Sequence, residues 1–182
     1  MQDAYRAPQR QAIAEILTAS HEFQLRALNW RRVLTDLITE IRAERAENIP
    51  ALNAELCEKE AAYAAAIMGV RRAFEIGSLT VVDARCWQEM VVAVTAFSRF
   101  NDDPDGKINL SSIDECEQFV ALNNERSRQL RVAVSALVKT ASGRLTPVES
   151  RRTRLQRRKA QLRLAELLGN RGSQTEGDGP EL

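Results

Sequence analysis

The chain has 182 residues, a formal net charge of +1 at neutral pH, and few aromatic residues, glycines and prolines. This length suits one domain with a substantial core rather than two domains. A net charge close to zero excludes a global attraction to polyanions, so a nucleic-acid partner requires a local basic patch. Alanine, leucine, arginine and glutamate are abundant, which predicts an all-α fold and argues against a sheet.

The cysteines and the first residues of the chain indicate the cellular compartment in which the protein is expected. Cys57, Cys86 and Cys116 are odd in number, widely spaced and set among apolar residues, which favours buried, reduced thiols. Residues 1–8 lack the apolar core of a signal peptide, and no run is long and apolar enough to cross a bilayer. We therefore expect a soluble, intracellular protein without a membrane partner.

A first long helix is predicted over residues 9–45, where nothing interrupts helical periodicity. An apolar stripe with steps of three and four residues runs along it and identifies core positions. These positions are Trp30, Leu34, Leu37, Ile38 and Ile41. Because Trp30 heads this row, we interpret it as a packing anchor rather than a platform on which a base stacks.

A second helix is predicted from Asn48 to about Arg72, with Asn48 as its cap and Pro50 in its first turn. A near-heptad seam follows it and predicts packing on another helix, of the same chain or of a second molecule. The seam consists of Ile49, Leu52, Leu56, Lys59, Tyr63, Ala66 and Val70. Gly77 and Ser78 mark a connection, and the Leu-Thr-Val-Val run over residues 79–82 could form a short strand fragment. We interpret this run as a linker.

A third helix is predicted over residues 82–100, with the Asp83 carboxylate at its positive N-terminal end. Its apolar residues recur at helical spacing and predict one face that requires a partner. They are Trp87, Met90, Val91, Val94 and Phe97. A fourth helix is predicted over residues 112–141, because residues 112–115 have the Ser-x-x-Glu pattern of a capping box and Gly143 can supply a C-terminal cap.

An acidic turn, residues 101–106, separates these two helices and contains a carboxylate cluster of Asp102, Asp103 and Asp105. Its spacing approaches that of a calcium-binding loop, but Ser112 occupies the twelfth position, where such a loop has a bidentate Glu. We therefore predict an ordinary turn without a metal. A further possibility is that the carboxylates of neighbouring copies crowd together and repel one another at neutral pH.

The middle of the fourth helix is wholly polar, and we interpret it as a candidate RNA-binding surface. Arg126, Arg128 and Arg131 could contact phosphates, while Asn123 and Asn124 could hydrogen-bond sugars or bases. The alternative is a kink in the helix that is simply exposed to water.

A strongly basic segment near the C-terminus offers a competing nucleic-acid patch. It consists of Arg151, Arg152, Arg154, Arg157, Arg158 and Lys159. Phosphate binding is one interpretation of this patch. The other is a solvated face on a helix that packs through a narrow apolar seam, formed by Val148, Leu155 and Leu162.

These elements predict a single helical domain over residues 1–168. An antiparallel four-helix bundle occupies about residues 23–142, and the basic segment adds a further helix over about residues 147–168. Residues 169–182 are rich in glycine and polar residues, which predicts a mobile tail.

Catalytic motifs are not recognisable in the sequence. His21 is the single histidine and has no cysteine or serine motif near it, and no glycine-rich phosphate loop or dense set of metal ligands is present. We expect a surface histidine on a helix, and a protein that is not an enzyme and has no cofactor.

The order of several short motifs carries a family resemblance. Trp30 precedes Val33, Leu34 and Leu37, Val-Asp-Ala-Arg opens the third helix, Ala-Phe-Ser-Arg ends it, and Asn-Asn follows a polar loop in the fourth. In order and spacing these parts resemble the coat proteins of rod-shaped plant RNA viruses, the tobacco mosaic virus-like superfamily. Residues 142–153 resemble the segment after the bundle in the hordeivirus and tobravirus branches. The resemblance covers about residues 23–155.

The resemblance implies a helical bundle that lies radially in a rod, with single-stranded RNA between layers of subunits near the inner ends of the third and fourth helices. It adds Arg99 to the RNA-binding residues of the fourth helix, and it places the carboxylate cluster at the inner channel, where it would favour disassembly. This chain departs from the family at Arg154 and Leu155, which replace expected aromatic and acidic residues.

The leading hypothesis is a capsid protein of a plant virus, found in the virion and the host cytoplasm. It would assemble with itself into a helical homopolymer and package single-stranded RNA through phosphate and sugar contacts. The rival hypothesis is a cellular helical-bundle adaptor or chaperone, whose near-heptad seam grips a partner helix and whose basic C-terminal helix binds a protein or nucleic acid. A calcium-regulated accessory of an enzyme is a third class.

Overall fold

The computed structural model describes residues 2–100, 112–145 and 159, and in this part of the chain all regular structure is helical. The sequence-based prediction of an all-α protein is confirmed for these residues. The elements are α1 (Gln2–Arg42), a 3-10 turn η1 (Ala46–Asn48), α2 (Ile49–Thr80), α3 (Ala84–Ser98) and α4 (Ile113–Arg144). The chain divides into two units, Met1–Leu145 and Thr146–Leu182. The four helices all belong to the first unit.

The starts of α3 and α4 confirm the predicted caps. The Asp83 carboxylate accepts hydrogen bonds from the backbone N–H groups of Arg85 and Cys86, each at 3.1 Å. The Ser112 hydroxyl accepts one from the N–H of Glu115 at 3.2 Å. Each cap satisfies donors that have no partner inside the helix, so the sequence fixes where both helices begin.

Gly77 is the clearest departure from the predicted boundaries. The sequence predicted a connection here, but α2 continues through Gly77 to Thr80. A Cβ atom at position 77 would lie 2.8 Å from the Cδ1 atom of Ile16 and 3.0 Å from the sulfur of Met90. The glycine therefore permits close packing of α1 and α3 on α2, and it does not end the helix. Gly143 is likewise helical, since α4 runs to Arg144.

The short linker between α2 and α3 is held by a residue from α1. Gln9 is 4% exposed, and its side-chain oxygen accepts hydrogen bonds from the N–H groups of Val82 and Asp83 at 3.0 Å. Asp83 also contacts the end of α4, because the Arg144 Nε–H donates to both Asp83 oxygens at 2.8 Å. These contacts fix α3 against α1 and against the end of α4.

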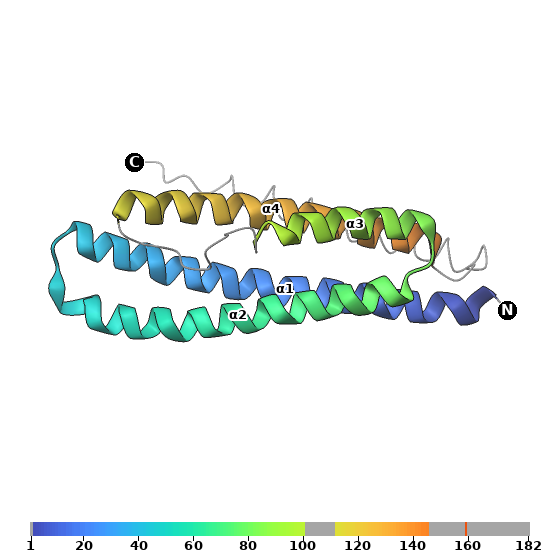
Figure 1. The fold of residues 1–182 in the computed structure, drawn as a ribbon, viewed down its shortest axis with the longest axis horizontal. Helices are drawn as coiled ribbons and strands as arrows, with labels where there is room; N and C mark the ends of the chain where they lie inside the picture. Colours follow the sequence, from blue (N-terminus) through green and yellow to red (C-terminus); the bar gives the residue numbers. More distant parts are fainter. Residues whose placement is uncertain (1, 101–111, 146–158, 160–182) are drawn as a thin grey trace, which may run out of the picture. The chain divides into compact units, whose positions relative to one another are not determined.

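Helix packing is uneven along the unit. α1 lies along α2 and α4, and α3 lies on α4 (Figure 1). α3 has 15 residues and α4 has 32, so the beginning of α4 extends beyond α3. The part of α4 that carries the predicted polar surface therefore lies near the end of the region that α3 covers.

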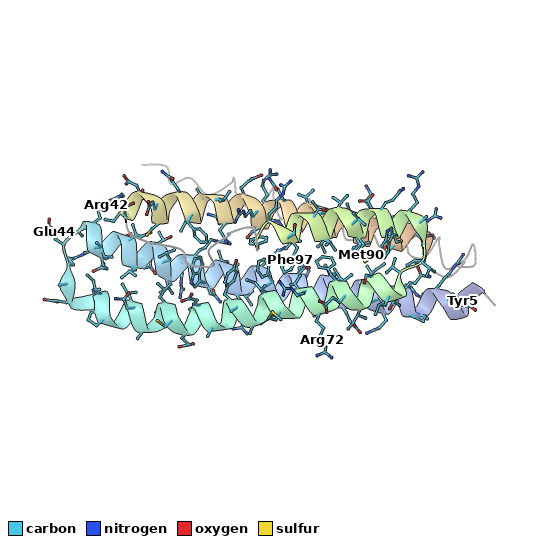
Figure 2. The ribbon with its side chains drawn as sticks, in the orientation of Figure 1. Tyr5, Arg42, Glu44, Arg72, Met90 and Phe97 are labelled. Carbon is cyan, nitrogen blue, oxygen red and sulfur yellow. The ribbon has the colours of Figure 1, made fainter. Side chains whose placement is uncertain are left out.

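Most buried apolar residues form one cluster, which we call the large core. All four helices contribute to it, and Met90 and Phe97 reach into it from α3 (Figure 2). Its buried members are Ala12, Ile13, Ile16, Phe23, Ala27, Val70, Ala73, Phe74, Val81, Cys86, Met90, Ala93, Ala96, Phe97, Leu130, Ala133, Val134, Leu137, Ala141 and Leu145. Its apolar burial is the main contribution to the stability of the unit.

A second cluster, which we call the small core, has no contribution from α3. Its buried members are Trp30, Leu34, Ile38 and Cys116. The Trp30 ring stacks on Tyr63 with centroids 5.5 Å apart and meets the edge of Phe119 at 5.6 Å. Trp30 is thus a packing anchor, as predicted, whereas Ile41 from the same predicted stripe is exposed.

The near-heptad seam of α2 is used inside the chain at least in part. Leu56 and Tyr63 pack against the small core, and Val70 is buried in the large core. Ile49, Leu52 and the remaining seam residues are half-buried. Leu56, Tyr63 and Val70 therefore serve the first of the two predicted roles, packing on a helix of the same chain.

Candidate nucleic-acid interface

Asn123 lies inside the protein, which corrects one predicted RNA contact. Its side chain is 2% exposed, its amide oxygen accepts a hydrogen bond from Arg31 Nη1 at 2.5 Å, and its Nδ2 donates to the Tyr63 hydroxyl at 3.2 Å. A buried amide that is bonded on both sides cannot contact RNA at the surface. Asn123 is part of the packing between α4, α1 and α2 rather than part of the interface.

The exposed residues of the polar segment share one face of α4. Asn124, Arg128 and Arg131 are spaced four and three residues apart, and all three are exposed. This spacing places side chains one above another along a helix. Asn124 also lines a groove between α4 and the last turns of α1. We call these three residues and Arg99 the cationic row, after its three arginines.

Arg99 joins the cationic row through a hydrogen bond between helices. It caps the end of α3, and its guanidinium donates to the side-chain oxygen of Gln129 on α4. Arg99 and Arg128 also line the same groove between α3 and α4. The structure thus brings Arg99 to the arginines of the fourth helix, from which it is separated by the acidic turn in sequence.

Arg128 is not a free cation, because it forms an ion pair within the chain. Its Nε and Nη2 atoms donate to the two oxygens of Glu125 at 2.8 and 2.7 Å, and Gln129 donates to the same carboxylate. The Arg128 and Gln129 hydrogen bonds lower the pKa of Glu125 to about 2. The pair is exposed to solvent, so it is weak enough to be exchanged for another anion.

Arg126 points to a different side of α4 from the cationic row. It is half-buried, and its positive charge, like that of Arg31, acts on the hydroxyl of Tyr63. Burial is the largest effect on Tyr63 and raises the pKa of its hydroxyl, while Asn123 and the two arginines oppose this rise. The predicted fourth-helix residues therefore divide between an exposed face and an inner polar layer, which contains Asn123 and is bordered by the half-buried Arg126.

Sequence reasoning missed the partner of this inner layer, which is Arg31 on α1. Arg31 is 7% exposed, and its Nη1 also donates to the Ser127 hydroxyl at 2.9 Å. Burial lowers the pKa of its guanidinium. Its position four residues after Ala27 and three before Leu34 was a signal that it lies on the buried stripe of α1.

The apolar face of α3 divides into an inner and an outer part. Met90 and Phe97 are buried, but Trp87, Val91 and Val94 from the same predicted stripe are exposed. The next helical position, Val92, is 55% exposed. α3 therefore shows an uncharged outer surface between Glu89 and Arg99, and we call it the outer face of α3.

A groove between α3 and α4 connects this outer face to the cationic row. Aliphatic and small side chains line most of it, and Arg99, Arg128 and Gln129 line the rest. The apolar lining consists of Val91, Val92, Ala96, Val132, Ala133 and Ala136. An apolar surface bordered by arginines is typical of a contact site for another macromolecule.

Several predicted features lie outside the described residues. These are the carboxylate cluster Asp102, Asp103 and Asp105, the tail 169–182, and most of the competing basic patch, namely Arg151, Arg152, Arg154, Arg157 and Arg158. Lys159 from that patch is described, and it is helical and exposed. The structure thus leaves the choice between the two basic patches as a prediction.

Other predicted single residues have clear positions. His21 is exposed on α1, as predicted, while Cys86 and Cys116 are buried and Cys57 is exposed. The expectation of three buried thiols is therefore wrong for Cys57. Burial raises the pKa of the Cys86 thiol to about 11, which makes it a poor nucleophile.

Clustered metal ligands or a long apolar helix would indicate a metal site or a membrane span. In the described part, no three His, Cys, Asp or Glu side chains come together in a way that could hold a metal ion. No helix there combines the length and apolarity that a membrane span requires. The chain matches no protein-family model, and no curated protein or solved structure shows significant similarity to it.

Proposed function

We propose that this protein is a structural coat protein that assembles into a helical rod and packages single-stranded RNA, as in rod-shaped plant RNA viruses. In this proposal α1 to α4 form an antiparallel four-helix bundle, and a basic helix over about residues 147–168 is added to it. The protein would be found in the virion and the host cytoplasm. It would bind its own copies and RNA, and it would not be an enzyme.

The observation that carries the proposal is the position of the cationic row beside the outer face of α3. A subunit of an RNA-containing polymer needs a surface for phosphates and an apolar surface for other subunits. Arg99 and Arg128 line the same groove as Val91, Val92 and Val132. One continuous surface therefore supplies both kinds of contact.

The chemistry of the row favours phosphate and sugar contacts over base recognition. Arginines bind phosphate oxygens in a planar, two-pronged geometry, and such contacts do not depend on sequence. Asn124 is the one amide of the predicted pair that is exposed and can reach a sugar or base edge. RNA binding is expected to be salt-dependent and of low base specificity.

The decisive experiment compares assembly with and without RNA by negative-stain electron microscopy. Wild-type protein should form rods when RNA is added, whereas the double variant Arg128→Gln/Arg131→Gln should remain unassembled and keep its helical circular dichroism. The matched control is Arg71→Gln/Arg72→Gln, which removes two exposed charges from α2. Figure 2 shows Arg72 pointing away from the other helices. A wild-type chain that stays monomeric and ignores polynucleotides at low salt would overturn the proposal.

The groove between α3 and α4 also favours the rival function, an adaptor or chaperone. Its aliphatic lining and arginine end fit an amphipathic partner helix with an acidic terminus. In that case Val132→Glu should abolish binding to the partner, while Arg128→Gln/Arg131→Gln should weaken it without an effect on RNA. The near-heptad seam is a poorer site for this role, because Tyr63 and Val70 already pack inside the chain.

A further inference from the structure

A polar layer crosses the interior where the large core meets the small core. We define it as Arg31 from α1, Tyr63 from α2, and Asn123 and Ser127 from α4. The side chains of Asn123 and Ser127 that accept from Arg31 are neutral, and among the described residues no carboxylate forms a salt bridge with Arg31. Among the described residues, the Arg31 cation of this layer therefore has no anionic partner.

This arrangement is unusual because an unbalanced charge is costly to bury. Only 7% of Arg31 is exposed, and its Nε atom has no hydrogen-bond partner among the described residues. Charged groups in protein interiors are normally paired with an opposite charge. The charge of Arg126 also reaches Tyr63, so a second guanidinium adds to the positive potential.

Two donors in the layer have no acceptor among the described residues. One is the Arg31 Nε–H. The other is the Tyr63 hydroxyl, whose oxygen accepts from Asn123 Nδ2, so that its own proton is free to be donated. Ser127 and Arg126 are half-buried, so the layer reaches solvent along α4.

We propose that the polar layer is a binding site for an oxyanion of the phosphate class, held by Arg31 and Tyr63 and enclosed from the solvent side by Arg126. The planar guanidinium is suited to oxyanions, which accept charge-assisted hydrogen bonds from it. The bound anion supplies the missing counter-charge. The phosphate is either a free ion or a group of the RNA backbone, and the site requires neither assembly nor the cationic row.

Thermal unfolding of the full chain tests the site directly. Inorganic phosphate is titrated against chloride at constant ionic strength, and a short oligoribonucleotide is titrated in parallel. At a phosphate concentration ten times its Kd, the wild-type Tm should rise by about 3–5 °C. Arg31→Met should abolish the rise, whereas the matched control Arg32→Met, an exposed arginine on the same helix, should preserve it.

A second variant allows the same test if Arg31→Met does not fold. Arg126→Gln changes a half-buried side chain and should weaken the phosphate response about tenfold in concentration. A response to inorganic phosphate alone identifies a free-ion site, and a response to the oligoribonucleotide alone identifies an RNA phosphate. No response to either ligand, or an equal response in wild type and Arg31→Met, overturns the proposal.

The outcome is separable from that of the proposed coat function. The double variant Arg128→Gln/Arg131→Gln leaves the polar layer unchanged, so it should lose RNA-dependent assembly and keep the Tm response to phosphate. If the layer proposal fails, wild-type rods still form with RNA. If the coat proposal fails, the phosphate response remains.

Discussion

The large core and the small core differ because the short helix α3 contributes to the first and not to the second. Where α3 is present, four helices meet, and the buried side chains are almost all apolar. Where α3 is absent, the small core has four buried members and depends on the rings of Trp30, Tyr63 and Phe119. Among the described residues, three buried polar atoms have no hydrogen-bond partner: those on Trp30 and Arg31 lie on this side, and that on Ser20 lies between large-core residues of α1. The large core supplies most of the apolar burial, whereas the region around the small core has more unpartnered polar groups.

The boundary between the two regions coincides with the segment that the sequence marks as wholly polar. Asn123 and Ser127 face the interior there and bind Arg31. Asn124 and Arg128 face outward. A polar run that seemed to interrupt the core in fact supplies both a buried layer and a surface, because successive residues of a helix point in different directions.

The largest expected effect tests the dominance of the large core. Phe23 is completely buried and its ring contacts Tyr63, Phe97 and Phe100 at centroid distances of 4.8–5.8 Å. Phe23→Ala should lower the free energy of unfolding by about 3–5 kcal/mol. Phe119→Ala in the small core should cost less, since Phe119 is half-buried. Urea denaturation measures both, and equal losses would contradict the comparison.

The boundary layer should behave as a coupled unit. Arg31→Met leaves the Asn123 oxygen without its donor, and Asn123→Leu leaves the Arg31 guanidinium less satisfied, so each single change is destabilising. In the double variant both polar groups are gone, and the coupling energy should be about 1–3 kcal/mol. A double-mutant cycle by chemical denaturation measures it. Additive effects would show that the two side chains do not stabilise each other.

Gly77 tests how closely the helices pack in the large core. Gly77→Ala should lower the free energy of unfolding by about 1 kcal/mol, because the clash with buried Ile16 and Met90 exceeds the gain in helix propensity. The matched control Gly69→Ala is also in α2 but has nothing within 4 Å of the added Cβ. It should be stabilising by about 0.5–1 kcal/mol. Thermal unfolding of both variants gives the sign of each effect.

Ionisation of Asp83, which caps the start of α3, makes the stability of the protein depend on pH. Burial opposes its ionisation, but the Cys86 N–H and the Arg144 guanidinium outweigh this effect and hold the pKa of Asp83 below its ordinary value. A lowered pKa in the folded state adds stability above the unfolded-state pKa of about 3.9, which is lost as the pH falls through the folded value.

Asp83→Asn isolates this charge, since Asn can still cap a helix. The variant should be less stable by about 0.5–1 kcal/mol at pH 7. Its stability should also fall less steeply than that of wild type below about pH 4. Denaturation at pH 7 and at pH 3 measures both effects, and parallel curves for the two proteins would show that Asp83 is not the titrating group.

The smallest expected change in stability is at Glu125, in the exposed pair with Arg128. Glu125→Gln should leave the unfolding midpoint at pH 7 unchanged, because both side chains are open to solvent. It should strengthen RNA binding severalfold at low salt, because Arg128 no longer has a competing carboxylate. Fluorescence anisotropy with a labelled oligoribonucleotide measures this affinity. Weaker binding by this variant would exclude Arg128 from the RNA contacts.

Local patterns in the sequence predicted the helical class, the starts of α3 and α4 at Asp83 and Ser112, and the packing role of Trp30. These features depend on periodicity and on groups a few residues apart, which a sequence displays directly. The same patterns misplaced the end of α2, because a glycine used for close packing has the same local signature as one used in a turn.

Only the tertiary structure decided which polar residues of α4 are buried and which face of α3 is exposed. Asn123 is buried because Arg31, which is 92 residues away in the sequence, lies against it. Trp87 and Val91 are exposed because the large core accepts only Met90 and Phe97 from the same apolar set. A sequence determines which residues share a helix face, whereas the packing partner that each face meets is fixed only when distant helices come together.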